Sequence, residues 1–521
     1  MRLRAQLCRN KHRTLAVVRS TLRRVFAVPG AKPRLLSLYP SANSLLCSAF
    51  AILGGAMNPA ENPAQRAPLG SERGDLERAL GLKEAVALNM IEMVGIGPFV
   101  VIPLVIKAMG GPQCLLAWAA GAALALLDGF VWSELGAAMP LAGGSYVFLR
   151  EAYGPGRMGR LMSFLFIWQT LIQAPLSLAS GAIGFSQYAS YLYPLGKYGQ
   201  KAVSGALVIL LVVLLYRRIA SIGRISLFLW AGVVDTILWL IWGGATHFQP
   251  RLVFTYAPGS WDFSWLFFAT LGSATVNTIY TYWGYYNICH LGGEIRDPAR
   301  NIPRGIFISI IGIAILYLAM QTSILGVLPW QQAQESPFIV SAFVEKLYGS
   351  GAARFATAMV LWIAFASVFS SLLGYSRVPY SAALDGNFFR IFARLHPKKK
   401  FPHVSLLFLG SLTFVFALLF KLKTVIAAVL AMRLIIQFIG QAVGVMLLRR
   451  RWPPERLPFK MWLYPLPALL TIAGWIWLFL RTGRAIWWGL FVIFMGLAVF
   501  LVQSRIRKEW PFAAPSTEAA Q

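Results

Sequence analysis

Long apolar stretches alternate with short polar connections along most of the 521-residue chain. A stretch of roughly 18 or more mostly apolar residues can cross a bilayer as a helix. We count about twelve such stretches, near residues 84–108, 113–138, 160–190, 200–216, 222–245, 263–290, 303–328, 352–375, 403–420, 424–448, 461–480 and 485–504. Transmembrane β-strands are shorter and alternate in polarity. The pattern therefore predicts an all-α, multi-pass membrane protein.

Charge is concentrated in the connections. Hydrophobic residues make up 57% of the chain and charged residues 13%, yet the net charge is +29. The basic residues form short clusters after every second apolar stretch, which is the pattern of the positive-inside rule rather than of a nucleic-acid interface. We therefore expect a plasma (inner) membrane protein with both termini in the cytoplasm, the lipid bilayer as a partner and no nucleic acid.

Cofactor and metal motifs are missing from the sequence. The four cysteines have neither metal-site spacing nor the pattern of a disulfide framework, and no phosphate-binding G-x-x-x-x-G-K-[ST] loop is present. We expect no cofactor, no metal and no catalytic residues, and hence no enzyme.

The N-terminal residues 1–81 differ from the rest of the chain. This extension is rich in arginine and has no acidic residue before Glu61. Three interpretations are open: an organelle transit peptide, a signal sequence with residues 45–56 as its apolar region, or an over-extended start with translation beginning at Met57. In each case we expect residues 1–81 to be basic and disordered.

The first apolar stretch contains Gly95-Ile96-Gly97-Pro98. Glycine is conformationally permissive and proline removes a hydrogen-bond donor, so an unstrained helix does not continue through this segment. A second half-helix starting near Pro98 would expose free N–H groups and a positive dipole end, which favour a carboxylate. The alternative is a simple kink for helix packing.

The sixth apolar stretch is interrupted at Trp283-Gly284-Tyr285. The half before this break would end in free carbonyl groups, which suit an ammonium group. Two broken helices in corresponding halves of a chain indicate an inverted-repeat transporter. The repeat would comprise stretches one to five and six to ten, and the paired breaks would bind a zwitterion such as an α-amino acid.

Three acidic residues lie within apolar stretches, and an intramembrane acid is costly unless it has a function or a partner. They are Glu92, Asp128 and Asp235. We predict that Glu92 and Asp235 take part in ion or proton coupling. The alternative is that Asp235 faces a polar helix contact and Glu92 a loop amide.

Several motifs resemble the amino acid–polyamine–organocation superfamily of permeases. The G-x-G at Gly95–Gly97 is similar to the break in that family's first helix. Ser133 to Pro140, followed by Gly143 to Tyr146 and Arg150 to Gly154, resembles its second helix and the next cytoplasmic segment. The E-x-x-D-P-x-R-x-I-P-R pattern of Glu294 to Arg304 resembles its sixth-to-seventh loop, and Arg377 to Tyr380 with Asp385-Gly386 resembles its segment after helix eight.

This resemblance implies the LeuT-like fold and secondary transport of amino acids or polyamines, often coupled to protons. It divides the chain into a transporter core at 82–450, two appended transmembrane helices at 451–505 and a cytoplasmic tail at 506–521. It places the substrate carboxylate on the Ile96 and Gly97 backbone and the ammonium near the Tyr280 and Tyr282 carbonyls. The substrate site would then comprise Gly95, Ile96, Gly97, Phe99, Tyr280, Tyr282, Trp283, Gly284 and Tyr285.

We expect four charged residues to form a gate or a scaffold at the cytoplasmic surface: Glu134, Arg150, Glu294 and Arg300. The chain departs from the family pattern at Trp283, where many members have a second glycine, and at Asp235, in a helix where some members have a lysine. The paired breaks, the intramembrane acids and this resemblance together predict a proton-coupled amino acid transporter. A polyamine or cationic amino acid permease is the first alternative, and a passive channel is the second.

Overall fold

The computed structural model describes residues 76–420, 432–483, 485–507 and 509–512. The chain divides into two compact units, Met1–Asn58 and Pro59–Gln521. The first unit lies outside the described residues, as does most of the predicted N-terminal extension.

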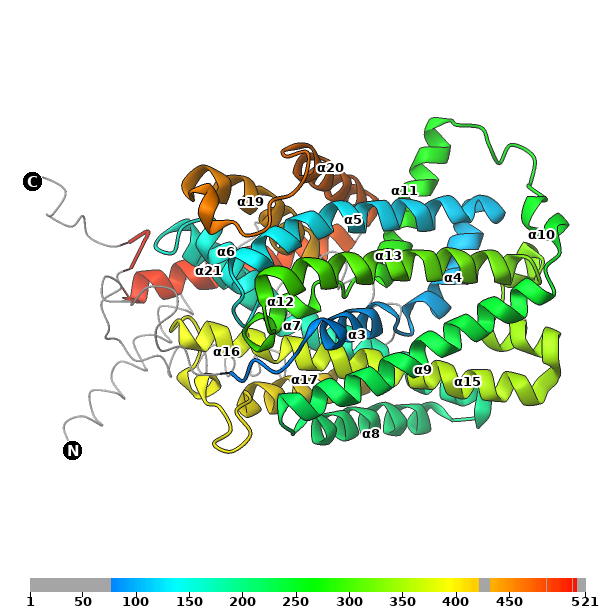
Figure 1. The fold of residues 1–521 in the computed structure, drawn as a ribbon, viewed down its shortest axis with the longest axis horizontal. Coiled ribbons are helices and arrows are strands. Elements are labelled where there is room, and N and C mark those ends of the chain that lie inside the picture. The colour runs from blue at the N-terminus through cyan, green and yellow to red at the C-terminus, as the bar shows by residue number, and fades with distance from the viewer. Residues whose placement is uncertain (1–75, 421–431, 484, 508, 513–521) are drawn as a thin grey trace, which may run out of the picture. The chain divides into compact units, whose positions relative to one another are not determined.

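Within the described residues every regular element is a helix (Figure 1). The α-helices are α3 (Leu82–Met93), α4 (Gly97–Met109), α5 (Leu115–Ala138), α6 (Ser145–Ala152), α7 (Met158–Leu192), α8 (Lys197–Leu215), α9 (Ile219–Thr246), α10 (Pro250–Phe254), α11 (Trp265–Tyr282), α12 (Asn287–His290), α13 (Pro298–Leu325), α14 (Trp330–Ala333), α15 (Ile339–Tyr375), α16 (Arg377–Leu384), α17 (His403–Leu419), α19 (Gly440–Arg451), α20 (Leu466–Arg481) and α21 (Ala485–Arg507).

Many of these helices are long enough to span a membrane. Among the described residues, seven helices have the length and apolar composition of a membrane span, and the bent pair α3–α4 makes eight if it is counted as one span. Helices α17 and α20 are apolar but shorter. The predicted tenth stretch falls partly on residues 421–431, outside the described residues, and continues as a π-helix at Leu434–Ile439 followed by α19. The prediction of an all-α, multi-pass membrane protein is confirmed at this level.

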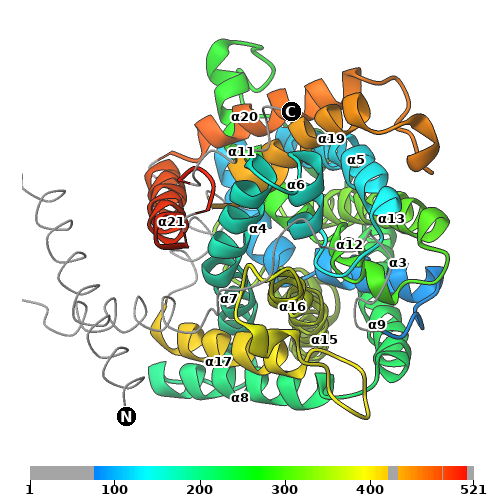
Figure 2. The same ribbon diagram turned by 90° about the vertical axis from the view of Figure 1, so that its left-hand side faces the viewer.

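The broken helices are surrounded by other helices. Helix α3 packs against α9, α13 and α15, while α4 packs against α11. Long helices run beside one another as the pairs α5–α13 and α7–α15. Figure 2 shows α8 beside α17 at one edge of the bundle and α21 on its outside. This arrangement covers both breaks with protein, as non-helical backbone at membrane depth requires.

The basic connections contact one another at one end of the helices. Lys399 Nζ donates to the Tyr216 carbonyl at 2.7 Å, and Arg451 Nη1 donates to the Ala152 carbonyl at 3.1 Å. Each bond joins two connections that the charge pattern places on the same side of the membrane. In Figure 1, α6, α12 and α16 lie toward this end, whereas α10 lies at the other.

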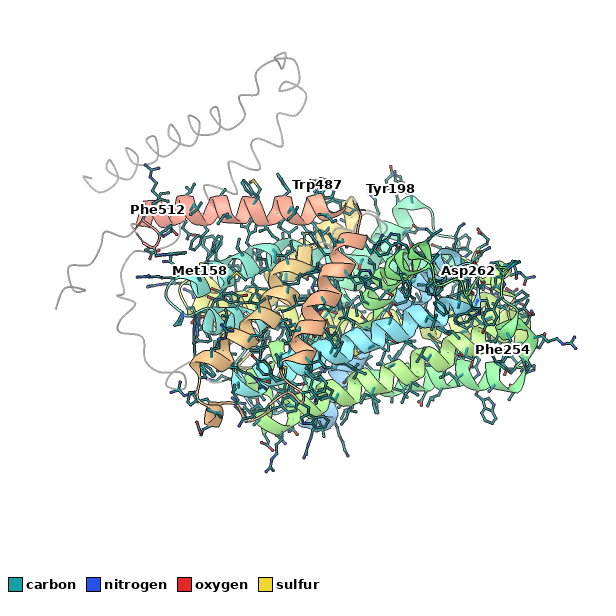
Figure 3. All side chains as sticks on the ribbon, turned by 90° about the horizontal axis from the view of Figure 1, so that it is seen from above. Met158, Tyr198, Phe254, Asp262, Trp487 and Phe512 are labelled. Carbon is teal, nitrogen blue, oxygen red and sulfur yellow. The ribbon has the colours of Figure 1, made fainter. Side chains whose placement is uncertain are left out.

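The outer surface of the bundle is apolar. Trp487 on α21 is 72% exposed and Phe494 is 73% exposed, and Figure 3 shows Trp487 on the outside of that helix. Aromatic residues at this exposure on a water-soluble surface would be unfavourable as a large patch. They suit a surface that faces lipid.

The segment Gly143 to Tyr153 contains helix α6 (Ser145–Ala152), which packs against α7 and α19. All of its residues except Glu151 are buried. The glycines before it allow this close packing, because Gly143 and Gly144 both have positive φ, at 96° and 48°. A Cβ on Gly143 would lie 2.5 Å from Ser381 Cβ, so the chain enters α6 through a turn with no room for a side chain.

Candidate functional site

The first predicted break is present. Helix α3 ends at Met93, α4 begins at Gly97, and the two helix axes differ by 47°. Pro98 occupies the first turn of α4, where its missing N–H costs nothing. Among the described residues, no group accepts a hydrogen bond from the N–H of Gly95, Ile96 or Gly97. These N–H groups are free at the positive end of the α4 dipole, which is the property of an anion site.

The second predicted break is also present, with a shorter second half than expected. Helix α11 ends at Tyr282, and α12 is only four residues long. Gly284 between them has φ +126°, which L side chains rarely adopt. The side chain of Asn89 on α3 stabilises this turn: its Nδ2 donates to the Tyr285 carbonyl at 2.6 Å, and its Oδ1 accepts from the Ile288 N–H at 3.1 Å. One buried amide thus replaces two backbone partners that a continuous helix would provide.

The two breaks lie against each other. A Cβ added to Gly284 would lie 2.8 Å from the backbone nitrogen of Met93 and 2.8 Å from Cγ of Glu92. The hydroxyl of Tyr317 on α13 donates to the Met93 carbonyl at 2.8 Å and approaches the Thr281 carbonyl at 3.2 Å. The C-terminal ends of α3 and α11 therefore meet around one tyrosine, although almost 200 residues separate them in the sequence.

A small cavity of about 60 Å³ lies between the breaks. A single water needs roughly 10–15 Å³ by this measure, so the cavity has room for a few small groups. Six predicted residues line it, from both breaks: Glu92, Gly95, Ile96, Gly97, Tyr280 and Trp283. The sequence therefore predicted both backbone segments that form this cavity.

The other predicted residues lie behind the breaks rather than on the cavity wall. Phe99, Tyr282, Gly284 and Tyr285 do not line the cavity. Tyr282 Oη donates to the Trp118 carbonyl at 3.2 Å, and Tyr285 Oη donates to Asp128 at 2.5 Å. These two tyrosines anchor the second break to α5.

Asp128 is a buried acid with a complete set of partners. Besides Tyr285, the indole nitrogens of Trp132 and Trp475 donate to its carboxylate at 2.7 Å and 3.2 Å. Three donors to one carboxylate are what a buried acid requires when it has a structural role. Asp128 therefore fixes the second break in place from a position outside the cavity.

Glu92 and Asp235 have contrasting surroundings. Glu92 lines the cavity, and its Oε2 is buried without any donor among the described residues. Asp235 is exposed on the outer face of α9 and does not line the cavity. Only Glu92, of these two predicted coupling residues, lies near the breaks.

Arg433 is the main cavity residue that the sequence analysis did not single out. It is 2% exposed and lines the cavity together with serines from α7 and α15. Its Nε donates to Gln437 at 2.9 Å, and its Nη2 donates to the hydroxyl of Tyr286. A charged residue inside an apolar stretch is itself a signal of function, and applying this rule to basic as well as acidic residues would have identified Arg433.

Two of the predicted gate residues form bidentate ion pairs with arginines from other segments. Glu134 accepts from Arg449 at 2.5 Å and 2.7 Å, and it also accepts from the Met461 N–H at 2.8 Å. Glu294 accepts from Arg377 at 3.0 Å and 2.7 Å. Both glutamates are fully buried, so these two ion pairs are shielded from water.

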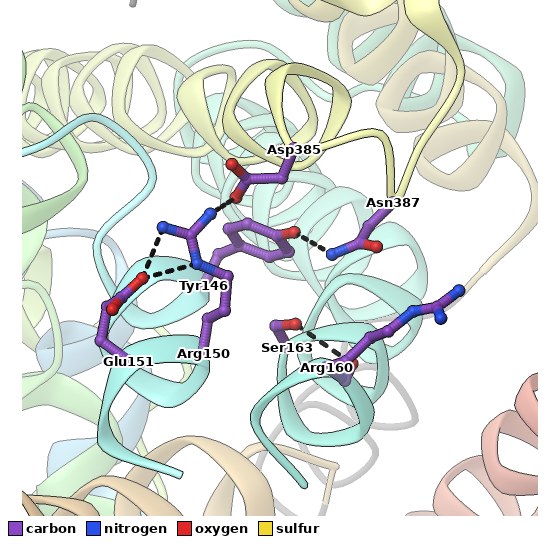
Figure 4. Close-up of polar contacts among 7 residues, drawn as sticks. All are labelled: Tyr146, Arg150, Glu151, Arg160, Ser163, Asp385 and Asn387. Atoms are coloured by element: carbon purple, nitrogen blue, oxygen red, sulfur yellow. Dashed lines mark hydrogen bonds and ion pairs between the residues drawn. The ribbon is translucent and has the colours of Figure 1, made fainter. Parts of the chain in front are cut away.

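Arg150 connects α6 to the segment after α16. Figure 4 shows its guanidinium between Glu151 and Asp385, with bonds of 2.8 Å and 2.6 Å to Glu151 and an ion pair with Asp385. Beside it, Asn387 donates to the Tyr146 hydroxyl at 2.6 Å. Burial, with the Asp385 carboxylate nearby, raises the pKa of Tyr146, so this hydroxyl stays protonated.

The fourth predicted gate residue, Arg300, has a different environment. Its side chain is exposed, and no ion pair joins it to another described residue. The described residues also contain no group of three or more His, Cys, Asp or Glu side chains arranged to hold a metal.

Comparison with known proteins identifies the family of the chain. Residues 80–501 match the family model described as amino acid permease. This match covers most of the chain, including both breaks, the cavity and the ion pairs. The chain belongs to the amino acid permease family.

Individual relatives differ in the class of amino acid that their names give. The chain is 27% identical to human cationic amino acid transporter 4 over 73% of its own length and 61% of that protein. It is 23% identical to the branched-chain amino acid permease BcaP of Bacillus subtilis, over 82% of this chain and 94% of the relative. It is also 25% identical to the aspartate-proton symporter of the same bacterium, over 75% of this chain and 76% of the relative. Cationic, apolar and acidic amino acids are named among these relatives, so similarity alone does not select the substrate.

Proposed function

We propose that this protein is a secondary active transporter that moves amino acids across a membrane by alternating access. The observation that carries the proposal is the meeting of two broken helices at one small cavity. Membership of the amino acid permease family supports it, as does the apolar outer surface of the helical bundle.

The chemistry of the cavity suits a zwitterion. The free N–H groups of Gly95, Ile96 and Gly97 would bind the substrate carboxylate, with the α4 dipole adding a favourable potential. The C-terminal end of α11, near Tyr280 and Trp283, would bind the ammonium group through backbone carbonyls and the negative dipole end. Phe99, Tyr282, Gly284 and Tyr285 would support this site from behind.

The transport cycle would follow from the same architecture. We propose twelve membrane spans, with a LeuT-like inverted repeat whose two broken helices are α3–α4 and α11–α12. Both termini would face the cytoplasm, where the buried pairs Glu134–Arg449 and Glu294–Arg377 close the pathway. Opening requires these pairs to separate and become hydrated.

Proton coupling is the finer part of the proposal. Glu92 is the acid that lines the proposed substrate cavity, and a carboxyl whose Oε2 has no donor there would gain or lose a proton as the cavity opens to water. Asp235, which faces outward from α9, would act only through a conformation in which α9 turns toward the pathway. The glutamate is thus the stronger candidate.

Transport by purified protein in proteoliposomes tests this function. Labelled amino acids and polyamines would be offered with and without an inward-directed proton gradient. We expect saturable uptake of amino acids, counterflow when the vesicles are preloaded, and stimulation by the gradient. Non-saturable flux without counterflow would instead identify a passive channel.

A polyamine or cationic amino acid permease is the second candidate function. The unpartnered Glu92 Oε2 favours it, because an extra ammonium group on the substrate would supply the missing donor. The same screen separates the two candidates, since spermidine, lysine and arginine would then be the preferred substrates.

A further inference from the structure

We propose that Arg433 contacts the side chain of the transported amino acid and selects acidic or hydrogen-bond-accepting side chains over cationic ones. This inference rests on the proposed amino acid transport and adds the substrate class. The observation behind it is a fixed guanidinium group, with unused donors, on the wall of the cavity between the two breaks.

The guanidinium of Arg433 is held rigidly by aromatic rings. Its Cζ lies 4.7 Å from the ring centroid of Trp283 and 5.1 Å from that of Tyr286, both at the second break. Phe438 and Tyr375 lie at 5.7 Å and 5.8 Å. Cation–π contacts at these distances stabilise the charged form and fix its position. The charge therefore belongs to the resting cavity and does not depend on bound substrate for its placement.

This charge has no counterion among the described residues. No carboxylate of the described residues lies within 4.0 Å of the Arg433 nitrogens, and Glu92 acts on this charge only at longer range. A buried cation without an ion-pair partner is expensive. The surrounding rings and the Tyr286 hydroxyl offset part of that cost, and an anionic or acceptor group in the cavity would offset more.

Part of the hydrogen-bonding capacity of Arg433 is also unused. A guanidinium carries five N–H donors; Nε donates to Gln437 and Nη2 to Tyr286. No described residue accepts from Nη1. Three N–H donors remain, two on Nη1 and one on Nη2. One from each nitrogen can face a carboxylate in a planar, bidentate arrangement, which the single side-chain oxygen of an amide or hydroxyl matches less completely.

The two helix breaks would bind the α-carboxylate and α-ammonium groups, so the Arg433 guanidinium remains available for the substrate side chain. The free N–H groups at Gly95–Gly97 are suited to the α-carboxylate, and the end of α11 is suited to the α-ammonium. Arg433 enters the cavity from a third segment, between residues 421–431 and the π-helix Leu434–Ile439. A substrate bound at both breaks thus meets Arg433 with its remaining part, the side chain.

Electrostatics gives the size of the expected selection. Two like charges about 6 Å apart, at an effective dielectric constant of about 20, repel by an amount worth roughly 100-fold in affinity. Lysine, arginine and polyamines would incur this repulsion, whereas aspartate and glutamate would gain a charge-assisted hydrogen bond. Glu92 would receive the α-ammonium or a proton rather than select a cationic side chain.

The test compares substrate panels for matched variants in proteoliposomes. Aspartate, glutamate, asparagine, serine, leucine, lysine and spermidine would be offered to the wild type, to Arg433→Gln, to Arg433→Lys and to Arg354→Gln. Arg354 is an exposed arginine on α15 that does not line the cavity, so its variant controls for loss of a positive charge elsewhere.

We expect the wild type to prefer aspartate or glutamate over lysine by about 100-fold. Arg433→Gln would lose most of this ratio through a higher KM for acidic substrates, while uptake of serine or leucine continues and shows that the variant is folded. Arg433→Lys would keep part of the ratio, and Arg354→Gln would keep all of it.

Two results would overturn the proposal: a wild type that prefers lysine or spermidine, or an Arg433→Gln variant that transports neutral substrates with an unchanged acidic-to-cationic ratio. If Arg433→Gln does not fold, the wild-type and Arg433→Lys panels still decide the question. A wild type that transports no amino acid at all would instead refute the proposed function, so the two failures are distinguishable.

Discussion

Glu294 and Arg377 face each other with two parallel hydrogen bonds, of 3.0 Å from Nε and 2.7 Å from Nη2, and neither side chain is more than 1% exposed. Arg377 also donates to the Leu373 carbonyl at 3.1 Å and to Ser376 Oγ at 2.8 Å. The pair joins the loop after α12 to the start of α16. Its burial means that, in the proposed transport cycle, opening this end of the bundle would have to break or hydrate an ion pair that is otherwise sealed from water.

Removing one partner of this pair should destabilise the protein strongly. Glu294→Gln leaves the Arg377 charge buried and uncompensated, which costs about 3–5 kcal/mol. We expect a clear fall in the thermal unfolding temperature in detergent. Glu335→Gln is the control, because its pair with Lys107 is more than half exposed on both sides and such pairs contribute about 0–1 kcal/mol. Equal stability of the two variants would refute a structural role for the buried pair.

Gly97→Val should abolish uptake without loss of folded protein. A Cβ at this position would lie 3.2 Å from Tyr280 Cε1, and the added methyl groups would occupy the approach to the free N–H groups. Displacement of a bound substrate by about 1 Å is worth on the order of 100-fold in rate. Gly351→Val is the matched control, because nothing lies within 4 Å of a Cβ there. Normal uptake kinetics for Gly97→Val would remove the first break from the substrate site.

Glu92→Gln should flatten the dependence of uptake on the proton gradient, because the amide cannot exchange a proton. Asp235→Asn makes the same chemical change on the outer face of α9, away from the cavity, and we expect it to leave the pH profile unchanged. The measurement is the initial uptake rate as a function of external pH, with a fixed gradient. A flat profile in Asp235→Asn and a normal one in Glu92→Gln would reverse the assignment.

Asn89→Leu should destabilise the second break. The substitution keeps the branched shape and the number of side-chain heavy atoms but leaves the Tyr285 carbonyl and the Ile288 N–H without their partner. Each unsatisfied buried group costs about 1–3 kcal/mol, so both unfolding temperature and uptake should fall. Asn277→Leu provides the comparison, because the Asn277 amide donates only to the Ser273 carbonyl of its own helix at 3.3 Å. If the two variants unfold at the same temperature, Asn89 does not hold the break.

The sequence by itself determined the features that depend on local covalent chemistry and on the bilayer. Apolar length predicted membrane helices, and the glycines and Pro98 predicted where two of them lose their backbone hydrogen bonds. These signals are local, because a backbone without a Cβ or without an N–H behaves in the same way wherever it lies in the fold. The four-residue length of α12 was not predicted, since the turn at Gly292–Glu294 and the contact with α3 end it.

Only the tertiary structure decided which side chains share the cavity. Tyr282 and Tyr285 belong to the second break, yet their hydroxyls bond to α5, whereas Arg433 comes from a segment about 150 residues away and lies over Trp283. Likewise, the partners of Glu134 and Glu294 are arginines that no spacing rule connects to them. Which face of a helix meets which neighbour depends on packing among all the helices, and that information is not contained in any one apolar stretch.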